Sequence, residues 1–416
     1  GWFGPDELWQ VYPSTQNISV GSLDIVHKPK FTVRHNRVDA VKGVGNRWYL
    51  NGPESLTGHY LPTIIPKDTY FRTHPEWFSE IDGVRTVSAT WWQYCYSNQA
   101  LATEIAGKVI QFFDRNPDYT QYTLAANDGW YEGWCECSAC AALGSRTDQI
   151  LTFTNRVAAI VGEKYPDKKL TVLSYFANFY APTRNFTMEP NLEIQFTRET
   201  NMYQPVSSGF NMGSSYYPET GNTYTVTWKD NVANWQARTG CENYGIWEWY
   251  CVAAAKPEWQ YIPWVQGRVA IQNQQYWKSI GADYIYYDQG PLPGYYETQD
   301  DYDLRWPLWY VASKGMWDAS LTSEQILKDA CRKLYGSAAD AMYGYYKCLE
   351  DISAECTARS VVWYSAPANQ MYTSANINRV NATVATVRQS LSGVTATQRA
   401  RIENQIALWE TAKQHI

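Results

Sequence analysis

The feature that most constrains the fold is a regular alternation of short apolar segments with longer amphipathic ones. This alternation is typical of α/β folds with a parallel sheet. Segments with strand character lie at residues 31–35, 58–65, 93–97, 122–127, 170–176, 192–197, 244–249 and 283–287. Eight strands are the number that closes a (β/α)8 barrel, so the sequence predicts a TIM barrel.

Amphipathic helices are expected between several of the strands and again after the last one. Apolar residues recur at helical spacing in 100–115, 148–165, 224–238 and 264–280. Later helices, with no strands between them, are expected at 304–317, 323–335, 338–355 and within 376–416. We therefore expect a catalytic (β/α)8 barrel over residues 1–300 and a C-terminal α-helical region over 301–416 packed on it.

Composition excludes several classes of protein. The net charge of −6 gives no basic excess to neutralise phosphates, so nucleic-acid binding is not expected. Apolar runs stay shorter than the roughly 18 residues of a membrane span, so none is predicted. Aromatic residues make up 16% of the chain, which suits a large core or a surface that stacks against sugar rings.

Four of the nine cysteines suggest a metal site or disulfides. Cys135, Cys137 and Cys140 form a C-x-C-x-x-C motif, and Cys95 is the nearest candidate for a fourth partner. Four thiolates could hold a structural zinc, but the paired C-x-x-C knuckles of typical zinc sites are absent from the sequence. Both alternatives stay open. The cysteines, together with sequons at three asparagines, favour a secreted, periplasmic or cell-surface protein.

Catalytic residues of a barrel are expected directly after the carboxyl ends of its strands. Asp128 follows an apolar strand inside Asn-Asp-Gly, where it serves either as a catalytic carboxylate or as the cap of a turn. Strand alternation puts Ile246 and Glu248 on one face, which we expect to point inward. Glu248 is then the second catalytic carboxylate, unless it forms an ion pair with Arg34 or Arg198.

Other polar and aromatic residues at the strand ends are candidates for substrate binding. They are Arg34, His59, Asn127, Trp130, Arg198, Glu199, Trp247, Tyr287 and Asp288. Among them, Glu199 and Asp288 compete for the catalytic roles, and the two arginines could clamp the carboxylate of an acidic sugar. Motifs for catalytic metals, nucleotides or a serine nucleophile do not occur in the sequence, so no catalytic cofactor is expected.

Several strings resemble a known family. They are GWFGPDEL at 1–8, HPEWF at 74–78, DGVR at 82–85, NDG at 127–129 with CECSAC at 135–140, and YGSAA at 335–339. Together they resemble the bacterial family of domain of unknown function 4838, which is similar in layout to α-glucuronidases. The resemblance implies an exported glycan-degrading protein, and a small α/β domain that normally precedes the first of these strings.

The residues and the resemblance together predict a glycoside hydrolase. We expect it to be exo-acting on a polysaccharide or glycoconjugate glycan, with Asp128 as general acid and Glu248 as nucleophile or base. The placement of the two carboxylates resembles that in a large clan of retaining glycosidases, except that Asn-Asp replaces Asn-Glu. The alternatives are a non-catalytic carbohydrate-binding protein and a structural scaffold organised by the cysteines. The distance between the carboxylates would decide between retention and inversion.

Overall fold

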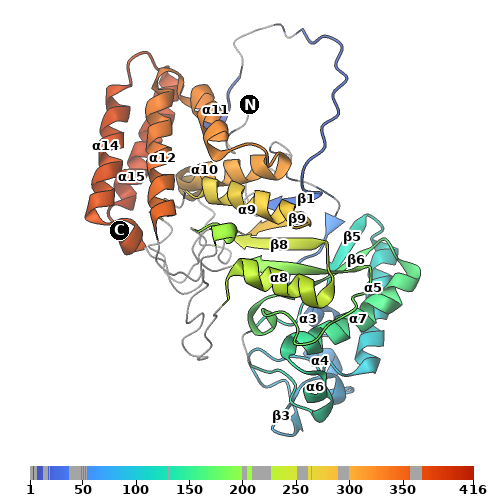
Figure 1. Cartoon of the computed structure of the whole chain (residues 1–416). Coiled ribbons are helices and arrows are strands. Elements are labelled where there is room, and N and C mark those ends of the chain that lie inside the picture. Colours follow the sequence, from blue (N-terminus) through green and yellow to red (C-terminus); the bar gives the residue numbers. More distant parts are fainter. Residues whose placement is uncertain are drawn as a thin grey trace.

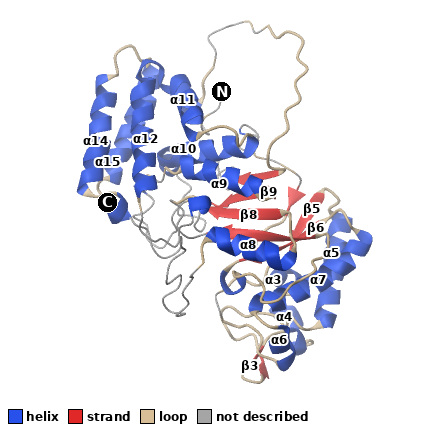
Figure 2. Ribbon diagram, viewed as in Figure 1, coloured by secondary structure: helices blue, strands red, loops and turns tan. Residues whose placement is uncertain are grey.

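The computed structural model contains a curved parallel sheet with helices packed on it, followed by a bundle of helices (Figures 1 and 2). The residues that it describes are 3, 7–12, 17, 19–36, 48, 50, 52, 54–129, 132–198, 204–208, 226–250, 261–263, 265–288, 299–356 and 368–416. Within them, no helix is both long enough and apolar enough to cross a membrane.

The sheet has seven parallel strands in the order β1-β9-β8-β7-β6-β5-β2. The strands are β1 (Val33–Asn36), β2 (Glu54–Ser55), β5 (Tyr119–Thr123), β6 (Lys169–Ser174), β7 (Leu192–Arg198), β8 (Tyr244–Trp249) and β9 (Ala282–Asp288). The prediction of a closed (β/α)8 barrel is wrong. β1 and β2 are the two edges of an open sheet, and the described residues contain no pairing between them.

Two of the eight predicted strands are not in the sheet. The segment 58–65 contains helix α3 (Leu61–Ile64), with Pro62 in its first turn. Proline lacks the N–H that a central strand needs but is tolerated where a helix begins. The segment 93–97 bonds its backbone to residues 77–79, so β2 pairs directly with β5 and no strand lies between them. The other six predicted strands are confirmed, five within two residues at each end; β5 starts and ends earlier than expected.

Helices form where the apolar period of the sequence predicts them. They include α5 (Gln99–Arg115), α7 (Arg146–Lys164), α8 (Trp228–Thr239) and α9 (Gly267–Ser279). The N-cap of helix α5 is Asn98, whose side chain accepts a hydrogen bond from the backbone N–H of Leu101. The N-cap of helix α7 is Ser145, which forms a capping box with Asp148. Caps of this kind satisfy N–H groups that have no partner inside the helix.

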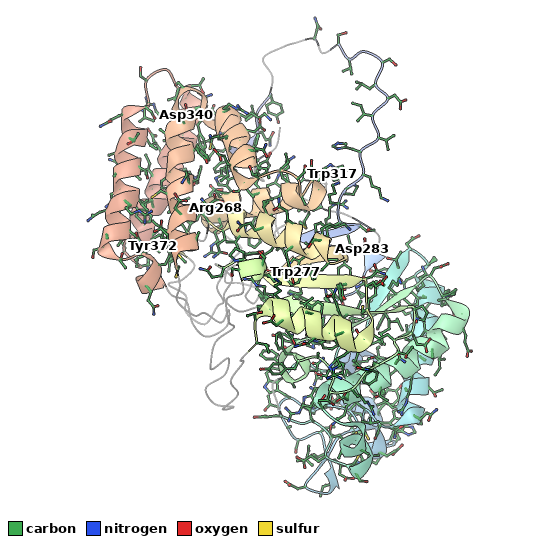
Figure 3. The ribbon with its side chains drawn as sticks, in the orientation of Figure 1. Arg268, Trp277, Asp283, Trp317, Asp340 and Tyr372 are labelled. Carbon is green, nitrogen blue, oxygen red and sulfur yellow. The ribbon has the colours of Figure 1, made fainter. Side chains whose placement is uncertain are left out.

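The two faces of the sheet differ in what covers them. Arg198, Glu248 and Tyr287 lie side by side in register, on the face that is packed against α9. Trp277 of α9, labelled in Figure 3, reaches this face. Side chains alternate along a strand, so the next register row, Thr197 with Trp247 and Tyr286, belongs to the opposite face. We call this opposite face the inner face.

A helical bundle follows the sheet, as the sequence indicates. Its helices are α10 (Gln299–Trp317), α11 (Ser323–Tyr335), α12 (Ala339–Glu355), α14 (Ser374–Gln389) and α15 (Ala396–Ala412). Buried aromatic residues such as Trp306, Tyr346 and Trp409 fill its core. Helix α10 packs on both α9 and the bundle, and it spans the predicted domain boundary near residue 300. That boundary therefore stays a prediction.

Candidate functional site

Aromatic rings line the inner face at the carboxyl end of β8 and β9. Trp247 and Trp249 are stacked, with ring centroids 6.0 Å apart and an interplanar angle of 16°. The ring of Tyr286 lies 4.6 Å from that of Trp247. Trp and Tyr side chains present a flat apolar face together with a polar tip.

Buried polar atoms without partners lie beside these rings. Gln195 Nε2, Thr197 Oγ1 and Trp247 Nε1 have no hydrogen-bond partner among the described residues. A buried polar group left without a partner costs about 1–3 kcal/mol. Native proteins usually satisfy such groups with another protein group or with ordered water. Within the part of the chain that the structure describes, the inner face therefore has hydrogen-bonding capacity that is not used.

His59 and Asp128 form a pair near this aromatic group. His59 Nδ1 lies 2.6 Å from the carbonyl oxygen of Ala126 and therefore donates to it. His59 Nε2 consequently faces Asp128 Oδ1, at a distance of 3.5 Å. The side chain of Asp128 is 50% exposed and that of His59 is 23% exposed. A half-exposed carboxylate next to an imidazole is able to exchange protons with a bound molecule.

Gly58, which precedes His59, lies next to the ring of Trp247 on the inner face. A Cβ atom on Gly58 would lie 3.7 Å from the ring of Trp247, and Gly58 has a positive φ of +100°. His59 follows Gly58 directly, so its loop packs against the edge of the aromatic group. Asp128 Oδ1 also accepts a hydrogen bond from the N–H of Gly129, at 2.8 Å. The turn-capping role that the sequence allowed for Asp128 is therefore present, together with its contact to His59.

Glu248 lies on the other face of the sheet, against α9. One of its oxygens accepts a hydrogen bond from Arg198 Nη1 at 3.0 Å, and the other accepts from Trp277 Nε1 at 2.6 Å. Both side chains of the ion pair are almost fully buried. The expectation that Glu248 points inward is wrong, because strand alternation shows which residues share a face but not which face is inner. Glu248 thus contacts Arg198 and Trp277 on the face that α9 covers, whereas Asp128 contacts His59 and Gly129.

We expect the Arg198–Glu248 pair to be structural. Replacing Glu248 by leucine would leave the guanidinium of Arg198 buried without its counterion. We expect the free energy of unfolding to fall by about 3–5 kcal/mol, the usual cost of breaking a buried pair. Urea denaturation measures this change. The exposed Glu403→Leu serves as the control and should shift stability by less than about 0.5 kcal/mol. Equal stability of the two variants would contradict the structural role.

The remaining predicted binding residues are placed as follows. Arg34 is buried with its Nη1 donating to the carbonyl oxygens of Phe31 and Thr32, and burial lowers its pKa. The Tyr287 hydroxyl accepts a hydrogen bond from Gln274 of α9. The Asn127 side chain donates to the carbonyl oxygen of Trp92. These contacts tie all three residues to the protein itself.

Three other predictions fall where the structure gives no side chain. Trp130 and Glu199 lie outside the described residues. Asp288 is described only by its backbone, which pairs in register with Trp249. By contrast, sequence reasoning missed Gln195 and Thr197. Alternation along the strand 192–197 would have placed them on one face. That they lie beside Trp247 follows only from the register between β7 and β8, which the sequence does not show.

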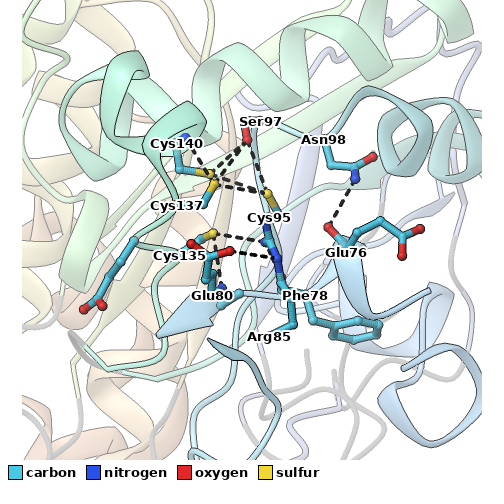
Figure 4. A network of polar contacts seen from close by, with 12 residues as sticks. Glu76, Phe78, Glu80, Arg85, Cys95, Ser97, Asn98, Cys135, Cys137 and Cys140 are labelled. Atoms are coloured by element: carbon cyan, nitrogen blue, oxygen red, sulfur yellow. Dashed lines mark hydrogen bonds and ion pairs between the residues drawn. The ribbon is translucent and has the colours of Figure 1, made fainter. Parts of the chain in front are cut away.

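The four cysteines form one buried cluster (Figure 4). Their sulfur atoms all lie within 4.8 Å of one another, and Cys95 Sγ is 3.8 Å from the sulfur atoms of both Cys137 and Cys140. A disulfide would need about 2.05 Å. A regular tetrahedron with arms of about 2.3 Å, the Zn–S bond length, has edges of about 3.8 Å. The cluster therefore has the geometry to bind a metal ion.

Hydrogen-bond donors surround the sulfur atoms. The backbone N–H of Glu80 donates to Cys135 Sγ at 3.3 Å, and Arg85 Nη1 lies 3.5 Å from the same sulfur (Figure 4). Hydrogen bonds from Cys135 and Cys140 hold the pKa of Cys95 well below its usual range. Burial disfavours the charge of Arg85, but its interactions with Cys95 outweigh burial and raise the pKa of Arg85. Burial opposes the charge of Cys137, but hydrogen bonds from the backbone of Cys140 and from Cys135 outweigh it and lower its pKa. Hydrogen bonds with neighbouring cysteines and burial raise the pKa of Cys140 and, on balance, that of Cys135. Negative charge is thus favoured on part of the cluster, and the thiolate is the form that binds metals.

Comparison with known proteins gives one family. The sequence profile described as Domain of unknown function (DUF4838) matches residues 5–347. This range includes every strand of the sheet, the His59–Asp128 pair and the four cysteines. A search of curated proteins found no match. The chain belongs to the family of domain of unknown function DUF4838.

Proposed function

We propose that the protein is a glycoside hydrolase that binds its glycan on the inner face of the sheet. The observation that carries this proposal is the half-exposed Asp128, paired with His59 beside the stacked Trp247 and Trp249. Gln195 Nε2, Thr197 Oγ1 and Trp247 Nε1 are buried and have no partner among the described residues, and their donors and acceptors would suit sugar hydroxyls. Aromatic walls with a small number of polar groups are typical of ligand sites.

In this proposal Asp128 is the general acid or base for the glycosidic oxygen. His59 Nε2, 3.5 Å from the carboxylate, accepts or returns the proton between turnovers. Glycoside hydrolysis usually needs a second carboxylate. Glu248 does not suit that role, because both of its oxygens are bonded inside the protein. Asp288, whose backbone lies opposite Trp249, is the better candidate.

The proposal keeps parts of the sequence-based expectation and drops one. An exo-acting, exported enzyme with an α-glucuronidase-like layout remains our proposal, since polymeric glycans are degraded outside the cell. A preference for acidic sugars loses its support, because Arg34 and Arg198 make their contacts within the protein. A screen of a glycan library for released sugars tests the proposal. Release from no glycan, with binding retained, would favour the alternative of a carbohydrate-binding protein.

We also propose that the four-cysteine cluster binds one structural zinc ion. All-sulfur donors select zinc or an iron–sulfur cluster, and four protein ligands leave no open position for catalysis. Four thiolates around a divalent ion leave surplus negative charge, which Arg85 partly offsets. A cavity of about 540 Å³ is lined in part by Cys135. Metal analysis of the purified protein should give about one zinc per chain; iron with acid-labile sulfide would contradict zinc.

A further inference from the structure

The segment that leads to Cys95 is bonded to the loop that carries Asp128. Gln93 is fully buried, and its Nε2 donates to the carbonyl oxygen of Asn127 at 2.7 Å. Gln93 Oε1 accepts from the N–H of the same residue, at 3.1 Å. The hydroxyl of Tyr96 donates to this oxygen at 2.8 Å and fixes the orientation of the amide. One side chain therefore satisfies both backbone groups of the residue that precedes Asp128.

Two glycines hold the same loop against Trp91. A Cβ atom on Gly129 would lie 2.3 Å from Trp91 Cβ, and one on Gly133 would lie 2.3 Å from the Trp91 carbonyl oxygen. Their φ angles are +137° and +72°, a backbone region that residues other than glycine rarely adopt. Gly129 thus lies against the side chain of Trp91, and Gly133 lies against the backbone of Trp91 and Trp92.

The cysteine cluster joins these two segments at their far ends. Cys95 follows Gln93 by two residues, and Cys135 follows Gly133 by two residues. The backbone of β3 (Glu80–Ile81) adds a third contact, because Glu80 N–H donates to Cys135 Sγ and Glu80 O accepts from the N–H of Glu136. A bound metal would therefore connect two separate segments beside the Asp128 loop, and Glu80 ties β3 to them by hydrogen bonds.

We infer that the metal centre and Gln93 together set the position of the Asp128 loop. Gln93 is a positioning residue: it acts on Asp128 through the backbone of Asn127 and touches no substrate. The metal centre keeps the Trp91–Cys95 segment in place, and Gln93 transmits that constraint. Metal content then regulates the geometry of the His59–Asp128 pair. This inference rests on the proposed metal site but not on glycan hydrolysis.

Hydrogen exchange of the full chain, followed by mass spectrometry, tests the inference without a substrate. Replacing Gln93 by methionine keeps the size of the side chain but removes its two hydrogen bonds with Asn127 and the one from Tyr96. We expect zinc content to stay at that of the wild type, while exchange at residues 124–129 becomes at least about tenfold faster, as for a locally opened segment. Exchange in α14 and α15 should not change. The exposed Gln389→Met, on α14, is the matched control.

A second measurement uses the wild-type chain. Removal of the metal with EDTA and a reductant should accelerate exchange at 124–129 and 132–135 more than in α14 and α15. If residues 124–129 of Gln93→Met exchange at the wild-type rate while zinc content is equal, Gln93 has no positioning role. Unchanged exchange of the loop after metal loss would overturn the role of the metal. Either failure leaves the proposed hydrolysis intact, because neither readout depends on a glycan.

Discussion

The Cys95→Ser variant is expected to lose its zinc and to unfold at a temperature about 10 °C or more below that of the wild type. Structural zinc sites contribute of order 10 kcal/mol to folding in small domains. At about 2.1 cal/mol/K per residue, a chain of 416 residues has an unfolding entropy of about 0.9 kcal/mol/K, so each kcal/mol lowers the midpoint by roughly 1 °C. Loss of one ligand also leaves three thiols packed together without a cation. Differential scanning calorimetry and elemental analysis of the same sample measure both effects.

Cys348→Ser is the matched control for this experiment. Cys348 is a half-buried free thiol on α12, outside the cluster. We expect its variant to keep one zinc per chain and to unfold within about 2 °C of the wild type, as is usual for mild substitutions outside key contacts. A Cys95→Ser variant that keeps both its metal and its unfolding temperature would contradict a four-cysteine zinc site.

Asp128→Asn is expected to lower turnover by about 10²–10⁴-fold, the usual contribution of a general acid or base. Asparagine has the size of aspartate but neither gives nor takes the proton. Its side-chain oxygen still accepts from the N–H of Gly129, so the turn is kept. We therefore expect glycan affinity within about threefold of the wild type, since binding does not require proton transfer. Steady-state kinetics and calorimetric titration with a glycan found in the library screen measure kcat and affinity separately.

Asp118→Asn tests whether this loss is specific. Asp118 is exposed in the turn before β5, at the opposite end of that strand from Asp128. The Asp118→Asn variant should keep wild-type turnover and affinity. If turnover of Asp128→Asn also stays at the wild-type value, Asp128 serves only as the cap of its turn. The protein would then have another catalytic site or would only bind carbohydrate.

The sequence predicts the sheet well where strands are buried on both faces. Residues 244–249 were predicted as a strand and form β8 over the same residues. The segment 58–65 misled the prediction because its apolar residues belong to the short helix α3, which begins beside Pro62. The segment 93–97 is extended, but its backbone bonds to residues 77–79 rather than to the sheet. Periodicity identifies an extended segment without identifying its partner, so the count of eight implied a closure that does not occur.

Part of the candidate site could also be predicted from the sequence. The sequence placed His59 and Asp128 at strand ends, and the structure brings them within 3.5 Å of each other. The four cysteines also come together as one cluster, although spacing alone did not distinguish a metal site from disulfides. Glu248 was assigned to the wrong face because alternation does not say which face the helices cover. Gln93 gave no signal, since its role depends on backbone groups that are distant in the sequence.

A crystal structure of Asp128→Asn, soaked with an oligosaccharide that the wild type cleaves or binds, would show where the protein holds a glycan. We predict a sugar ring against Trp247 on the inner face, with hydrogen bonds to Gln195 or Thr197 and its glycosidic oxygen next to residue 128. A sugar bound elsewhere on the protein, with the inner face closed by the protein's own side chains, would contradict the account.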